Sequence, residues 1–351
     1  MAVVLIEGFD HLASNSATLK GWNNDGGLQM TGRFGGFSLE SRNSATFAHG
    51  LPSTYSTLHF GAALYITGGY TAGTTNVMAF INGATVNGSV RVSTSGANRV
   101  WSLHNAAGTQ VAIGTIPILN GVWYYLELKI VVSATVGTLE LRLNGLPTAE
   151  CSATGLNTGS VNVDNIGFGW VNGWGIRMDD IYVTDTTGPA PNDGFLGDIR
   201  VDYLVPTAAG SKTNFTPSAA ANWQTVDETT PSDADYNSSY VPGAMDLFTM
   251  ADLSGNGVIY AVQTNLRAAK SDAGFRTVKP VFYEASGSGD TTRFYPGRRS
   301  DALISTYKFS PQLYDTSPDT ATAWTVAEVN ALQFGYMVGE ASMFTLDARL
   351  V

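Results

Sequence analysis

Short runs in which apolar and polar residues alternate, with turn residues between them, constrain the fold of this chain most strongly. One run carries apolar residues at every second position, at Leu126, Leu128 and Ile130, while Tyr125, Glu127 and Lys129 occupy the opposite face. The next run repeats the pattern with Leu139, Leu141 and Leu143, and it ends at Asn144-Gly145, a dipeptide typical of tight hairpins. The sequence therefore predicts an all-β fold.

The composition agrees with a β-sandwich and excludes several kinds of partner. Among 351 residues there are 39 glycines, and charged residues make up only 14%, which indicates a neutral-polar surface rich in turns. The net charge is −10 and the longest basic cluster is Arg298-Arg299, so no nucleic-acid partner is expected. Cys151 is the single cysteine, which rules out an internal disulfide framework.

A break in the pattern divides the chain into two modules. Strand-forming residues end at Asp185, a Thr/Gly/Pro segment follows, and a new alternating run begins at Ile199. We expect one β-sandwich in residues 1–186, a linker in 187–197 and a second β-sandwich in 198–351. Further strands are expected in residues 199–205, 257–263, 278–283 and 303–309. Pro280 should place its strand at a sheet edge or a bulge.

One short helix is expected in residues 325–332 near the C-terminal end of the second module. Thr325 and Glu328 have the spacing of a capping box, in which the first residue caps the helix and the second bonds back to it. The helix is too short to form alone and should pack against the strands.

The order of motifs in the first module resembles a known family. Gly121-Val-Trp-Tyr-Tyr-Leu-Glu-Leu128, a strand ending in Leu-Asn-Gly, an Ile-Gly-Phe-Gly strand and Met178-Asp-Asp-Ile-Tyr-Val183 follow one another as in the concanavalin A-like jelly rolls. That family includes laminin G-type and pentraxin-type modules. The resemblance implies a jelly-roll sandwich and three functions to test on residues: calcium-dependent glycan binding, glycan hydrolysis and sugar stacking.

The acidic residues of the first module do not predict catalysis. Asp164, Asp179 and Asp180 are the carboxylates available for calcium, but alternation places Asp179 and Asp180 on opposite faces unless a bulge intervenes. Asp164 and Asp180 remain the candidate metal ligands, and no cofactor is expected. The family's hydrolases carry Glu-x-Asp-x-x-Glu on one strand, which is absent. Glu127 and Glu140 should be solvated surface charges, so the chain is not expected to be an enzyme.

Three aromatic residues are the candidates for sugar binding. Trp170, Trp174 and Tyr182 lie near glycine-rich turns, where an exposed ring can stack on the apolar face of a sugar. Burial of at least one of them in the core is the simpler alternative.

Segments of the second module resemble virion proteins of tailed bacteriophages, in this order along the chain: residues 192–201, 222–228, 235–239 and 323–335. The resemblance implies a non-catalytic structural subunit that is tail-associated and able to bind a host-surface glycan. A capsid decoration or cement protein is the alternative, and a polysaccharide depolymerase is a third.

The virion resemblance also implies where the chain works and with what. The expected partners are other virion proteins and further copies of this chain in a homo-oligomer. Residues Met1–Asp10 lack a basic region and have an apolar run of about five residues, so neither a signal peptide nor membrane insertion is expected. The chain would be made in the host cytoplasm and end in the virion.

Overall fold

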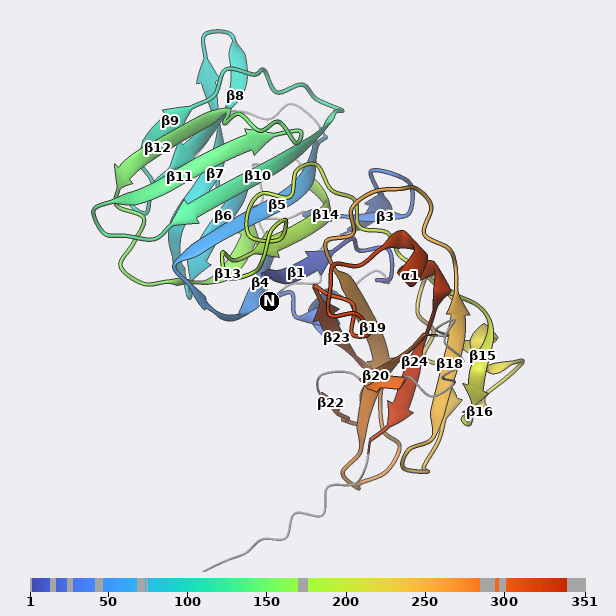
Figure 1. Ribbon diagram of the computed structural model, residues 1–351. Coiled ribbons are helices and arrows are strands. Elements are labelled where there is room, and N and C mark those ends of the chain that lie inside the picture. The colour runs from blue at the N-terminus through green and yellow to red at the C-terminus, as the bar shows by residue number, and fades with distance from the viewer. Residues whose placement is uncertain are drawn as a thin grey trace, which may run out of the picture. The chain divides into compact units, whose positions relative to one another are not determined.

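The computed structural model describes residues 2–12, 17–23, 28–41, 47–67, 73, 75–169, 176–284, 294–296 and 301–339. Nearly all of its regular structure is β, as predicted (Figure 1). The chain forms two compact units. Unit 1 contains Met1–Tyr203, Tyr260–Val262 and Leu313–Asp315, and unit 2 contains the remaining residues. Residues 187–197, expected to be a linker, thus belong to unit 1.

Two antiparallel sheets form the sandwich of unit 1 (Figure 1). The first sheet has the order β12-β11-β10-β5-β14-β3-β2, and β1 also pairs with β14. Its strands are β1 (Val3–Glu7), β2 (Leu28–Thr31), β3 (Phe37–Ser41), β5 (Thr57–Ile66), β10 (Trp123–Val131), β11 (Gly137–Leu143), β12 (Cys151–Leu156) and β14 (Ile176–Thr184). A 3-10 helix, η1 (Ala17–Lys20), lies between β1 and β2 in the chain.

The second sheet of unit 1 has the order β4-β13-β6-β7-β8-β9. Its strands are β4 (Phe47–Tyr55), β6 (Met78–Asn82), β7 (Thr85–Ser95), β8 (Asn98–His104), β9 (Gln110–Ile113) and β13 (Val163–Phe168). Aromatic rings join the two sheets across the core. The ring of Phe60 on β5 lies 5.2 Å from that of Phe168 and 6.0 Å from that of Phe80, centroid to centroid.

The hydrophobic alternation correctly predicts the inner face of the first sheet. The apolar positions on β10 and β11 are fully buried, and they are Leu126, Leu128, Ile130, Leu139, Leu141 and Leu143. The opposite face of the sheet is also covered near its middle. There Ala63, Tyr125, Tyr182 and Leu196 form a buried cluster, so the segment around Leu196 acts as a third layer.

Unit 2 contains one six-stranded sheet in the order β15-β18-β24-β20-β21, with β22 paired to β20. The two-stranded sheet β16-β17 also belongs to unit 2, as do most residues of the two-stranded sheet β19-β23, whose Val262, Leu313 and Tyr314 are assigned to unit 1. The strands are β15 (Pro206–Thr213), β16 (Thr216–Pro217), β17 (Asn237–Ser238), β18 (Met245–Met250), β19 (Val262–Ala268), β20 (Thr277–Glu284), β21 (Phe294–Pro296), β22 (Asp301–Ala302), β23 (Lys308–Tyr314) and β24 (Leu332–Val338).

Pro280 lies within β20 at a position that tolerates a residue without an N–H group. On one side β20 pairs with β24 along its length, including Pro280 with Tyr336. On the other side β22 pairs with Thr277 and Val278, and β21 pairs from Val281 onward. The prediction of an edge strand is therefore wrong, because β20 lies in the interior of its sheet; among the described residues, Pro280 itself is paired on the β24 side.

The predicted helix is present as α1 (Val326–Ala331), and both hydrogen bonds of the Thr325–Glu328 capping box are formed. Another 3-10 helix, η2, spans Asn222–Thr225. Strands predicted at 199–205, 257–263 and 303–309 are wrong in position: the regular pairing begins at Pro206, Val262 and Lys308 instead. In the described part of the chain, no helix has the length and apolar character needed to cross a membrane.

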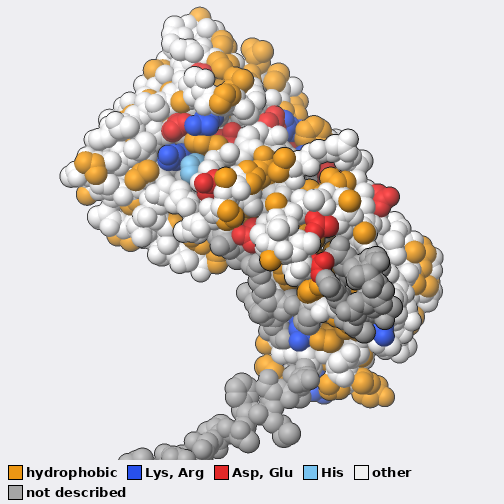
Figure 2. Space-filling model, viewed as in Figure 1, with side chains coloured by type: hydrophobic (Ala, Val, Ile, Leu, Met, Phe, Trp, Pro, Cys, Tyr) orange, Lys and Arg blue, Asp and Glu red, His pale blue; other side chains and the backbone are white. Residues whose placement is uncertain are grey.

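The surface agrees with the low charge content of the sequence. On the face drawn in Figure 2, acidic and basic side chains occur in small mixed groups, separated by neutral-polar and apolar surface. This face therefore carries mixed clusters of both signs and not an extended field of one sign.

Candidate functional site

Asp179 and Asp180 lie on β14 at the point where its neighbour in the sheet changes. Residues 176–178 pair with β3, whereas residues 181–184 pair with β1. On the other side, the register with β5 shifts between Asp179 and Tyr182, and Asp180 has a φ of 49°. The extra residue makes a β-bulge, so strict alternation of side chains does not hold here. The expectation that alternation separates the two acids is wrong for this reason, and both contact Arg33.

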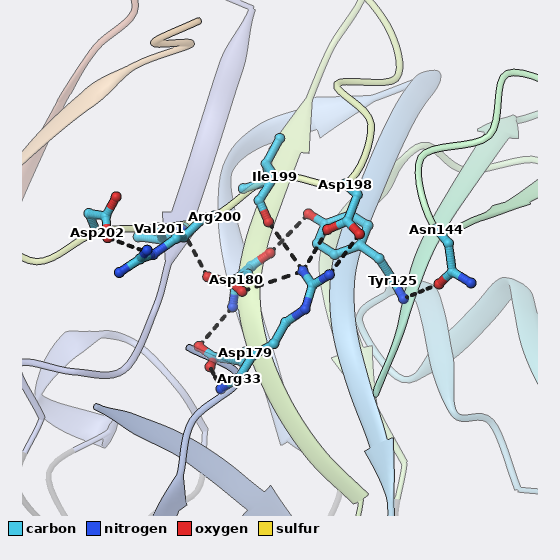
Figure 3. A network of polar contacts seen from close by, with 10 residues as sticks. All are labelled: Arg33, Tyr125, Asn144, Asp179, Asp180, Asp198, Ile199, Arg200, Val201 and Asp202. Atoms are coloured by element: carbon cyan, nitrogen blue, oxygen red, sulfur yellow. Dashed lines mark hydrogen bonds and ion pairs between the residues drawn. The ribbon is translucent and has the colours of Figure 1, made fainter. Parts of the chain in front are cut away.

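The carboxylates at the bulge accept hydrogen bonds from the backbone (Figure 3). Asp179 accepts from the N–H of Arg33 at 2.8 Å and from the N–H of Asp180 at 2.9 Å. Asp180 Oδ1 accepts from the N–H of Val201 at 2.8 Å. The backbone carbonyl of Asp180 accepts from the Tyr125 hydroxyl at 2.9 Å. These bonds tie β14 to the turn before β3 and to the segment that follows Gly197.

Arg33 supplies the positive charge of the cluster. Its two terminal nitrogens each donate to one oxygen of Asp198 at 2.6 Å, a bidentate pair (Figure 3). One of these nitrogens also lies 3.7 Å from Asp180 Oδ2. That oxygen is buried and has no hydrogen-bond partner, so the guanidinium compensates its charge through space and not through a direct bond.

Burial changes the protonation of the acid pair. Asp179 is 5% exposed and Asp180 is 2% exposed. Burial raises the pKa of both carboxyls, and the charge of Asp180 raises that of Asp179 further. The N–H groups and Arg33 oppose this rise, more effectively at Asp180. Near neutral pH, Asp179 is therefore the carboxyl that retains a proton.

This arrangement ties neighbouring segments of unit 1 to β14 through the two acid side chains. Three of the four side-chain oxygens on the two acids are hydrogen-bonded to this chain's own backbone, and neither acid faces solvent. Within the described residues, no group of three or more His, Cys, Asp or Glu side chains has the geometry to hold a metal ion. The network instead fixes residues 198–201 against β14 by side-chain bonds, which explains why the alternating run from Ile199 forms no strand.

Glu127 is a third buried acid on the same face of the sheet, and its predicted solvation is wrong. It is 1% exposed, accepts a hydrogen bond from the Tyr182 hydroxyl, and accepts another from the N–H of Gly197 at 2.7 Å. The Tyr182 oxygen in turn accepts from the N–H of Leu196 at 3.0 Å. Glu140 is different: it is partly exposed and pairs with Arg142 at 2.8 Å.

Other predicted site residues lie apart from this cluster. Asp164 is on β13 in the other sheet, where it accepts from the N–H of Gly83 at 3.0 Å, so it is not brought together with Asp180. The ring of Tyr182 is fully buried, and a Cβ on Gly61 would come within 2.0 Å of it. Trp170 and Trp174 lie outside the described residues.

A separate buried cluster involves Glu7, His11 and Lys20. Lys20 Nζ lies 2.8 Å from Glu7 Oε2 and 2.8 Å from His11 Nε2. Burial and the neighbouring ammonium lower the pKa of His11 to about 3, so the ring is neutral at neutral pH. Burial alone would raise the pKa of Glu7, but Lys20 and His11 outweigh it and lower that pKa to about 2. The cluster is a buried ion pair with a neutral imidazole acceptor.

The sequence analysis missed Arg33 and Asp198, which complete the acid cluster. Arg33 stands in the turn Gly32-Arg-Phe-Gly-Gly36, and a charged residue within a glycine-rich turn is the one local signal of its role. Asp198 immediately precedes the run that was interpreted as a strand. It pairs with Arg33, 165 residues earlier, and a contact so distant in sequence produces no local pattern.

No family model matches this chain, and no curated protein matches it. Solved structures with some likeness include domain 4 of AbnA, a GH43 extracellular arabinanase from Geobacillus stearothermophilus, in complex with arabinotriose. It is 11% identical, covers 52% of this chain and 92% of its own, and has a TM-score of 0.38.

Two more such structures are a heptameric SAP-like pentraxin from Limulus polyphemus and a carbohydrate-binding module of phage origin. The pentraxin is 14% identical, covers 41% of this chain and 71% of its own, and has a TM-score of 0.30. The other is the CBM2 module of the evolved Dit of Lactobacillus casei BL23 phage J-1, 14% identical, covering 42% of this chain and 75% of its own, with a TM-score of 0.29. At these scores, the likeness carries no argument about function.

Proposed function

We propose that this chain is a non-catalytic structural subunit of a tailed-phage virion, located at the tail, whose first sandwich binds a host-surface glycan. The resemblance of residues 192–201 and 323–335 to virion proteins supports the place in the particle. The resemblance of the first module to concanavalin A-like jelly rolls supports a binding role. Other virion proteins and further copies of the chain are its partners.

The proposal that the chain is non-catalytic rests on the burial and hydrogen bonding of three acids in unit 1. A glycosidase needs two carboxyl groups facing a substrate across a gap of fixed width. Here Asp179, Asp180 and Glu127 are each at most 5% exposed and hold the chain's own N–H groups. Acids used in this way stabilise the covering segment around Leu196, which favours a binding module over a depolymerase.

The test has two parts. Antibody to the purified chain is applied to phage particles and viewed by electron microscopy; label at the tail supports the proposal, whereas label on the head supports capsid decoration. The purified protein is then incubated with polysaccharide from the host cell surface. Binding without shortening of the chains agrees with the proposal, and shortened chains would refute the non-catalytic assignment.

A further inference from the structure

Phe34 is an exposed aromatic residue next to Arg33, which belongs to the hydrogen-bond network of Asp179, Asp180 and Asp198. Its side chain is 55% exposed, and it is the one exposed Phe, Tyr or Trp ring among the described residues of unit 1. It occupies the turn between β2 and β3, where Arg33 forms a bridge with Gly35. A single exposed ring is common on a protein surface and is not evidence of a partner by itself; Phe34 differs in that its turn is held in place by the bonds described next.

Hydrogen bonds to three aspartates hold the turn that carries Phe34. The backbone N–H of Arg33 is bonded to Asp179, and its guanidinium is bonded to Asp198. On the other flank, the N–H of Phe37 donates to Asp10 Oδ1 at 2.6 Å. A ring on such a turn keeps its direction before a ligand arrives, so binding loses less conformational entropy.

Gly36 shows that this turn has little freedom to rearrange. Its φ is 57°, a left-handed conformation that side chains disfavour. A Cβ at this position would also lie 2.1 Å from Asp10 Oδ1. The close approach of Asp10 therefore requires glycine, and it holds the turn in the conformation that exposes the ring.

Two guanidinium groups make cation-π contacts with the exposed ring. The guanidinium carbons of Arg33 and Arg200 lie over it, 4.7 Å and 5.0 Å from the ring centroid, and the side chain of Phe34 remains 55% exposed. Arg200 is 50% exposed at its side chain and is held by Asp202, 27% exposed, at 2.7 Å (Figure 3). An apolar ring beside a planar donor and a carboxylate acceptor offers stacking to the C–H face of a sugar and hydrogen bonds to its vicinal hydroxyls.

The charges at this place favour a neutral ligand. Arg33 is matched by Asp198, and Arg200 is matched by Asp202. Of the arginines described at this turn, neither is left unpaired to attract a carboxylate or a sulfate, and burying an unpaired acidic sugar here would cost desolvation energy.

We propose that Phe34, with Arg200 and Asp202, forms a binding platform for a neutral saccharide on unit 1. This inference rests on the proposed function, since it names the site and the class of glycan. Arg33, Asp198 and Asp10 are positioning residues, because their hydrogen bonds hold the turn that carries the ring.

The experiment measures binding of the full chain and its variants to an array of neutral and acidic bacterial saccharides, with dissociation constants determined for the best neutral ligand. F34A is expected to bind that ligand about ten-fold more weakly, the loss typical of one stacking ring. F34W should keep or improve binding, and R200A should weaken it. L119A is the matched control, because Leu119 is 58% exposed and lies on unit 1 away from β2 and β3 in the chain.

The outcomes separate the site from the function. If the unmodified chain binds a neutral saccharide and F34A binds it equally well, the platform is wrong while glycan binding stands. If the unmodified chain binds no saccharide, both glycan binding and the platform are wrong. Binding restricted to acidic saccharides would overturn the neutral class. Thermal unfolding of F34A should match the unmodified chain.

Discussion

Replacing Lys20 by methionine should destabilise unit 1 strongly at neutral pH. Lys20 Nζ lies 2.8 Å from Glu7 Oε2, and the two side chains are 2% and 1% exposed. Without the ammonium, Glu7 would be a buried carboxylate that accepts from the N–H of Phe9 at 2.9 Å beside a neutral His11. Removing one partner of a buried ion pair costs about 3–5 kcal/mol, a large part of the about 5–15 kcal/mol by which a domain is stable.

The lowered pKa of Glu7 gives a second value for the stabilisation that this ion pair provides, and the two values are similar in size. It is lowered from 4.5 to about 2 in the folded chain. Because each tenfold change in the equilibrium corresponds to about 1.4 kcal/mol, the folded state favours ionised Glu7 by about 3 kcal/mol. This contribution is fully present above the unfolded pKa of 4.5 and is lost as the pH falls from about 4.5 to 2.

The assay is equilibrium unfolding in urea, followed by tryptophan fluorescence, at pH 7 and at pH 4. K20M should lose about 3–5 kcal/mol at pH 7. The loss should be smaller at pH 4, because burial without Lys20 raises the pKa of Glu7 and the carboxyl becomes neutral. The double variant E7Q/K20M should be more stable than K20M, since no charge is left buried. A loss below about 1 kcal/mol, or a loss independent of pH, would refute the reasoning.

Three further substitutions test the covering segment, the turn between β2 and β3, and the bulge. Y182F should lower the free energy of unfolding by about 2–4 kcal/mol, because buried Glu127 and the N–H of Leu196 both lose a partner; Y240F, at a ring 85% exposed, should change nothing. G36A should cost about 1–3 kcal/mol through its positive φ, while an equally stable variant would contradict that strain. The raised pKa of Asp179 predicts that stability falls as the pH rises from about 4 to 8, and D179N should flatten this decline in urea titrations at several pH values.

Local periodicity was sufficient to predict β10, β11 and the inner face of the first sheet, but it misplaced three strands of the second module. Leu126, Leu128 and Ile130 repeat every second residue, and that repeat specifies both a strand and its buried face. The helix beginning after Thr325 was equally predictable, because its cap is formed by residues three apart in the sequence.

The candidate site was predictable only in part, because it depends on contacts distant in sequence. Alternation placed Glu127 on a polar face, but Gly197, 70 residues later, covers it. Asp180 was expected to follow the alternation of its strand, whereas the bulge arises where β3 ends and β1 begins beside β14. A short-range pattern contains no information on which later segment will lie over a strand.

Unit 1 is not a contiguous stretch of sequence, and this limits how the chain can be divided. Leu196 belongs to the buried cluster with Tyr125 and Tyr182, and the Tyr260 hydroxyl donates to the carbonyl of Leu196 at 3.0 Å. A fragment that ended at residue 186 would open the third layer to water and leave Glu127 without the N–H of Gly197. Recombination that exchanged the first sandwich for another would therefore have to carry residues 187–203 with it, and would still separate Tyr260 from its acceptor.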